Sequence, residues 1–117
     1  MKKMTSLSEL YECVASAGEN EWIYTNIEAW HNNPQHCEFY FISEDEVEEM
    51  ADDEVYESEA GPYLPASVKN LDLYPWMQID VLKGVLENAG INNEHFDDNN
   101  FVKAINYYRE NDDFMDA

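Results

Sequence analysis

The chain has 117 residues, of which 44% are apolar and 14% aromatic, enough for one hydrophobic core but not for two. Its 26 acidic and six basic residues give a formal net charge of −20, so nucleic acid and anionic membrane surfaces would repel it. A basic protein would be attracted to such a surface, and we expect a single acidic α+β domain over residues 1–117.

The N-terminal sequence MKKMTSLSELYECVASAG contains two lysines but lacks the continuous apolar segment of an export signal. No stretch approaches the roughly 18 consecutive apolar residues of a membrane span. These features predict a cytoplasmic protein in which Cys13 and Cys37 remain reduced thiols.

A helix is predicted over residues 7–17. Ser6 followed by Glu9 matches the capping box that begins many helices, and Gly18 is a suitable residue to end one. The apolar residues between them recur at helical spacing, which indicates one buried face. They are Leu7, Leu10, Tyr11 and Val14.

Two strands are predicted next, within residues 21–30 and 37–43, because both segments are rich in aromatic and β-branched residues. Residues 31–36, with the sequence HNNPQH, have the composition of a loop, so the strands could form a hairpin. Aromatic residues on strands usually belong to the core, which is the interpretation favoured here for Trp22, Phe39 and Phe41.

The following segment, residues 43–61, contains ten carboxylates in nineteen residues and no Lys or Arg. Ser43 and Glu46 form a second capping-box pattern, and Val47 and Met50 are the nearest apolar anchors. A short helix or an irregular acidic loop is predicted. Repeated like charges and few apolar side chains place this segment on the surface.

Residues 61–79 include three prolines and therefore predict an extended segment, with a strand around residues 71–76 only at its non-proline positions. Two helices follow. The first has apolar residues on one face up to Gly90, and the second begins after the Asp/Asn cluster at 97–100. The predicted fold is α+β: a small antiparallel sheet with an N-terminal helix and two C-terminal helices.

Catalytic and metal-binding patterns are weak. His31, His36 and Cys37, with His95 further on, match no standard zinc spacing. The sequence contains no Gly-rich phosphate loop and no nucleophile elbow, and no pair of carboxylates stands out as an acid/base couple. We expect a protein that is not an enzyme and that needs no cofactor or metal.

Binding of a basic protein explains the acidity better. Nucleases keep Lys, Arg and His in their clefts to hold phosphates, so carboxylates can occupy the same positions. Tyr56 and Tyr63 flank the acidic segment and Trp30 precedes it, and each could act as an aromatic anchor. The predicted partner-binding residues are Glu44, Asp45, Glu46, Glu48, Glu49, Asp52, Asp53, Glu54, Tyr56, Glu57 and Glu59.

The C-terminal sequence FVKAINYYRENDDFMDA resembles the ending of a family of small acidic bacterial proteins. That family is similar to the immunity proteins of contact-dependent growth inhibition and polymorphic toxin systems. The resemblance extends over the predicted first helix and strand and the C-terminal third, and it implies an α+β fold, no catalysis and a cognate toxin domain, commonly a nuclease. Its shared residues are Ala104, Ile105, Tyr107, Tyr108, Asn111, Asp112 and Phe114.

The leading hypothesis is therefore an immunity protein that neutralises a toxin by occluding its basic active site. The alternative is a DNA mimic that inhibits a restriction or DNA-binding protein. Duplex DNA carries one charge per about 1.7 Å of axis, so a mimic needs long rows of carboxylates. The concentration of acids in residues 43–61 favours a local patch. An acidic surface that serves only solubility is a third interpretation.

Overall fold

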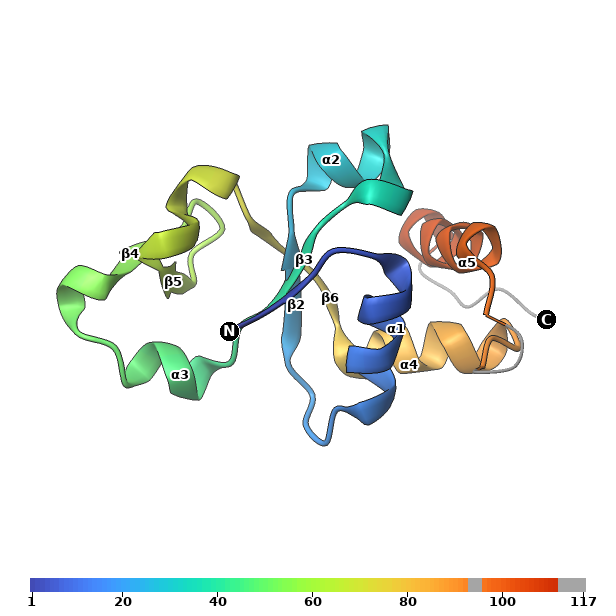
Figure 1. Ribbon diagram of the computed structural model, residues 1–117, viewed down its shortest axis with the longest axis horizontal. Coiled ribbons are helices and arrows are strands. Elements are labelled where there is room, and N and C mark those ends of the chain that lie inside the picture. Colours follow the sequence, from blue (N-terminus) through green and yellow to red (C-terminus); the bar gives the residue numbers. More distant parts are fainter. Residues whose placement is uncertain (93–95, 112–117) are drawn as a thin grey trace.

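A four-stranded antiparallel sheet lies at the centre of the computed structural model, which describes residues 1–92 and 96–111 (Figure 1). The strand order is β1-β3-β2-β6, so strands distant in sequence lie side by side. The strands are β1 (Lys2–Met4), β2 (Trp22–Thr25), β3 (Phe39–Phe41) and β6 (Tyr74–Gln78).

Three helices cover one face of this sheet (Figure 1). They are α1 (Leu7–Ser16), α4 (Ile79–Asn88) and α5 (Asp98–Asn111), and all three were predicted. The Ser6 hydroxyl accepts a hydrogen bond from the Glu9 backbone N–H at 3.1 Å, as the capping pattern requires. The predicted end at Gly18 is wrong by one residue, because Ala17 caps the helix in an extended conformation.

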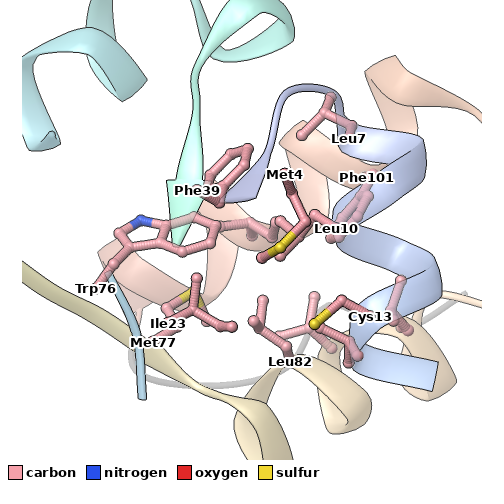
Figure 2. Packing of buried hydrophobic residues seen from close by; sticks show 14 of the residues in the cluster. Met4, Leu7, Leu10, Cys13, Ile23, Phe39, Trp76, Met77, Leu82 and Phe101 are labelled. Atoms are coloured by element: carbon pink, nitrogen blue, oxygen red, sulfur yellow. The ribbon is translucent and has the colours of Figure 1, made fainter. Parts of the chain in front are cut away.

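The larger core lies between these helices and the sheet (Figure 2). Side chains alternate along each strand, so Ile23 and Phe39 point into this core while Tyr24 and Tyr40 belong to a second cluster. Both faces of the sheet are therefore buried, which requires a covering layer on each.

A β-bulge adjusts the edge strand β6 to the larger core. Ile23 lies opposite Met77, but its neighbour Tyr24 lies opposite Pro75. Trp76 is the additional residue, and it and Met77 both pack into the helical core (Figure 2). Pro75 is tolerated because β6 is at the edge of the sheet.

The second layer is formed by residues 43–73, which we call the acidic lobe; it lies on the side of the sheet away from α1, α4 and α5 (Figure 1). A smaller cluster joins the lobe to the sheet, and it consists of Tyr24, Tyr40, Ile42, Leu64, Val68 and Leu73. The elements of the lobe are α3 (Glu44–Glu48), β4 (Val55–Glu57), β5 (Tyr63–Pro65) and two 3₁₀-helices, η2 (Asp52–Glu54) and η3 (Ala66–Leu71).

The connection between β2 and β3 differs from the prediction. The strand predicted within residues 21–30 ends at Thr25, and helix α2 (Ile27–Asn32) and the 3₁₀-helix η1 (Pro34–His36) replace the hairpin loop. Asn26 explains the change, because its side chain accepts a hydrogen bond from the Ala29 backbone N–H at 2.9 Å and so caps a new helix.

The remaining strands show what pattern alone missed. The strand predicted around 71–76 is β6, displaced to Tyr74–Gln78, whereas β1, β4 and β5 were not predicted. Each of those three has only three residues, too short for an alternating pattern to be recognised. The predicted class is confirmed: the chain is one α+β globule. No described helix is long and apolar enough to cross a membrane.

Candidate partner-binding surface

The acidic segment begins with helix α3, whose first turn carries three of its carboxylates. The Ser43 hydroxyl accepts a hydrogen bond from the Glu46 backbone N–H at 3.2 Å and caps α3. Glu44, Asp45 and Glu46 occupy the first turn, where unpaired backbone N–H groups favour negative charge. The segment is thus part of an ordered lobe. The predicted short helix is found over Glu44–Glu48, whereas the strand β4 later in the segment was not predicted.

Three of the ten carboxylates have partners within the protein. Glu46 lies 2.7 Å from the N-terminal amine of Met1. Glu54 accepts a hydrogen bond from the Ala51 backbone N–H at 3.1 Å, and Glu59 accepts one from the Tyr74 hydroxyl. Glu46 and Glu59 therefore help to hold the lobe to the rest of the protein, whereas Glu54 bonds within the lobe.

The other seven carboxylates make no hydrogen bond or ion pair with any residue that the structure describes. The nearest cation in sequence is Lys69 of η3, which lines a small cavity with Glu57 and Glu59 but lies in no ion pair among the described residues. The lobe thus carries a negative field that the chain itself leaves largely uncompensated. The seven carboxylates belong to Glu44, Asp45, Glu48, Glu49, Asp52, Asp53 and Glu57.

The negative charge of the acidic lobe also acts on Glu21, the residue before β2. Partial burial raises the pKa of the Glu21 carboxyl, and repulsion from Glu44, Glu19 and Asp45 raises that pKa further. A backbone hydrogen bond from Glu44 opposes the shift. Glu21 was not among the predicted binding residues, but it extends the acidic surface toward the start of β2.

A groove of about 610 Å³ lies in the acidic lobe between α3 and the β4–β5 hairpin. Its volume is within the range of known ligand sites, roughly 300–1,000 Å³. Among the described residues, Tyr63 is the most exposed of the large apolar side chains, at 56%. The groove is lined by Val47, Glu48, Met50, Asp52, Val55, Tyr56, Glu57 and Tyr63.

Of the three proposed aromatic anchors, two lie at this groove. Tyr63 is exposed and Tyr56 is half-buried. The proposal for Trp30 is wrong: α2 carries its side chain into the core, where it is 1% exposed and packs against Trp76 and Phe39. The reason is the unpredicted helix α2, which points the Trp30 side chain inward.

The aromatic residues assigned to the core give a mixed result. Phe39 is fully buried, and Phe41 is half-buried against the same cluster. Trp22 was wrongly placed in the core, since it is 40% exposed at the beginning of β2. A terminal strand residue has fewer neighbours to cover it, which composition cannot reveal.

The residues considered as metal ligands differ in their exposure to solvent. His31 and His36 are exposed, whereas Cys37 is buried and its sulfur is 3.0 Å from the Thr25 hydroxyl. Burial raises the pKa of the Cys37 thiol and likewise that of Cys13, which disfavours the reactive thiolate. No group of three or more metal-ligating side chains occurs among residues 1–92 and 96–111; His95 is outside the described residues.

Sequence reasoning missed the apolar part of this surface. Val55 was not proposed as a binding residue, Met50 was considered only as an apolar anchor of the segment, and Tyr63 was proposed as an aromatic anchor without its apolar neighbours. The signal was the alternation in Val55–Glu57, which puts Val55 and Glu57 on one face of a strand and Tyr56 on the other. It could be used only once the β4–β5 pairing was known.

Comparison with known proteins gives a family but no characterised relative. A family described as a domain of unknown function (DUF7716) matches residues 6–117. No curated protein and no solved structure matches the chain.

Proposed function

We propose that this chain, which belongs to the DUF7716 family, is an immunity protein that neutralises a cognate toxin domain by covering its basic active site. The observation that carries the proposal is the set of seven carboxylates without an internal partner, presented on an ordered lobe of the fold. The resemblance of the C-terminal segment to small acidic immunity proteins supports the same role.

The proposed mechanism is occlusion rather than chemistry. A nuclease cleft concentrates Lys, Arg and His side chains to hold phosphate groups, and carboxylates can pair with the same side chains. Long-range attraction would also bring the two proteins together quickly, since complementary charge can raise association toward about 10⁸ M⁻¹s⁻¹ at low salt. The protein would act in the cytoplasm, where a toxin reaches nucleic acid.

The arrangement of the acids favours a toxin cleft over DNA mimicry. A mimic of duplex DNA needs carboxylates in long rows, because DNA carries one negative charge per about 1.7 Å of its helix axis. Here the unpartnered carboxylates belong to α3, η2, β4 and the residues between them, all within one lobe at one end of the molecule (Figure 1). A local patch suits a single concave partner.

The test is neutralisation of a candidate toxin. The candidate is a basic C-terminal domain sought in the neighbouring reading frame. It is expressed with and without this chain, and cell growth and complex formation are measured. Growth restored only in the presence of the chain, together with a stable complex, is the expected result. Continued growth arrest without a complex would overturn the proposal, and inhibition of several unrelated DNA-binding proteins would support mimicry instead.

A further inference from the structure

One face of the β4–β5 hairpin is only partly covered by the residues that the structure describes. Tyr56 lies opposite Leu64 in the register, and both pack toward the sheet in the smaller cluster. Since side chains alternate along a strand, Val55, Glu57 and Tyr63 lie on the opposite face. That face contributes to the 610 Å³ groove; Pro65 on it is buried, whereas Val55 is half-buried and Tyr63 is exposed.

The groove combines an apolar floor with a charged rim. Val55 and Met50 are half-buried and Tyr63 is 56% exposed, although water is an unfavourable environment for each of them. Glu48, Asp52 and Glu57 also line the groove and are exposed, and none of their three carboxylates has a hydrogen-bond or ion-pair partner among the described residues. Its occupant should therefore supply apolar surface and positive charge together.

We propose that this groove is the docking site for a cationic segment of the partner protein, in which an apolar or aromatic side chain stands between Lys or Arg residues. The inference rests on the proposed function and specifies the chemistry of the partner. The central side chain packs on Val55, Met50 and Tyr63, while the flanking cations pair with Glu48, Asp52 and Glu57. A cation over the ring of Tyr63 gains further attraction.

Charge complementarity selects this occupant over the alternatives. A second copy of the chain would bring another net charge of −20 to a surface that is already acidic. A nucleic acid or an anionic lipid would be repelled in the same way. A neutral apolar segment would fill the floor but leave the rim carboxylates desolvated without partners, which is costly.

The test uses two synthetic peptides of equal length and equal Lys and Arg content, which differ only in carrying Phe or Ser at the central position. Affinity for the full chain is measured by calorimetry, and the site is mapped by amide chemical-shift changes. The Phe peptide should bind at least about tenfold more tightly, because burial of an aromatic side chain is worth that factor or more. Shift changes should centre on α3, β4 and β5.

Three variants separate the floor from the rim. Tyr63→Ser, and Val55→Thr as a second change that preserves a β-branched strand residue, should reduce the preference for Phe while leaving the salt dependence intact. The rim variant Glu48→Gln/Asp52→Asn/Glu57→Gln should weaken both peptides and flatten their salt dependence. The matched control Glu12→Gln/Glu87→Gln/Glu110→Gln removes the same charge from exposed positions on α1, α4 and α5 and should change little.

Two results would overturn the inference: equal affinity for the Phe and Ser peptides, or shift changes that map to the helical face or to the separate cavity of about 430 Å³ beside α2. These outcomes are distinct from failure of the immunity role. Neutralisation without peptide binding in the groove would place the toxin on another surface, whereas groove binding without neutralisation would indicate a different basic partner.

Discussion

The hydroxyl of Tyr74 in β6 donates a hydrogen bond to the carboxylate of Glu59, in the turn of the β4–β5 hairpin. This bond connects the central sheet to the acidic lobe, and it raises the pKa of Tyr74 because deprotonation would place two negative charges side by side. The lobe is thus held to the sheet by a polar contact as well as by its small apolar cluster.

Removing the hydroxyl with Tyr74→Phe should loosen the hairpin without unfolding the chain. We expect faster hydrogen exchange of the β4 and β5 amides and unchanged exchange in α1 and α4, since the larger core is untouched. Tyr63→Phe is the matched control, because Tyr63 is exposed and makes no hydrogen bond with the described residues. Equal exchange in both variants would show that the bond does not hold the lobe.

The same contact predicts that the protein loses stability at alkaline pH. The folded-state pKa of Tyr74 lies above its ordinary value, so the stability contributed by the bond is complete below that ordinary value and is lost as the pH rises through the folded value. Wild-type protein should therefore lose stability at alkaline pH more steeply than Tyr74→Phe. Denaturant unfolding at a series of pH values measures the difference.

Asn106 supports the aromatic cluster from α5. Its side-chain oxygen accepts a hydrogen bond from the Trp30 indole N–H at 3.0 Å, and Trp30 is 1% exposed. Asn106→Ala should lower the free energy of unfolding by about 1–3 kcal/mol, because a buried donor loses its acceptor. The control Asn88→Ala removes an exposed amide that bonds only within α4 and should cost roughly 0.5 kcal/mol or less. An equal loss of unfolding free energy in the two variants would contradict a stabilising role for the Trp30–Asn106 hydrogen bond.

Glu21 predicts how stability responds to acid. Its folded-state pKa is raised by partial burial and by the neighbouring carboxylates of Glu44, Glu19 and Asp45. A raised pKa gives a contribution that is complete below the ordinary value of about 4.3 and is lost as the pH rises through the folded value. Glu21→Gln should therefore lose less stability than wild type as the pH rises through this window, as measured by thermal unfolding. Parallel curves would contradict the assignment.

The sequence indicated the parts of the fold that have strong local signals. The capped amphipathic pattern of α1 and the apolar faces of α4 and α5 predicted three helices, and aromatic content located β2 and β3. Helix α2 was missed because Trp30 and Ile27 favour strands by composition, whereas the side chain of one residue, Asn26, caps a helix. Strands β4 and β5 were missed because three residues each are too few to show a periodicity, and β5 ends at Pro65.

The candidate site was only half predictable for a similar reason. The carboxylates of residues 43–61 are visible as a run of letters, and the structure places them on one lobe. The division between Glu46, Glu54 and Glu59, which bond within the protein, and the remaining acids depends on tertiary contacts. The groove depends on the pairing of β4 with β5, which brings Tyr63 beside Glu57.

The most direct measurement is the association rate of the chain with the basic toxin domain identified in the growth assay, determined over a series of ionic strengths. Electrostatic steering by the acidic lobe predicts a rate constant that falls by about tenfold or more from low to physiological salt. The fall should be smaller for the Glu48→Gln/Asp52→Asn/Glu57→Gln variant and unchanged for the control with Glu12, Glu87 and Glu110 replaced. A wild-type rate that does not vary with salt would contradict the account.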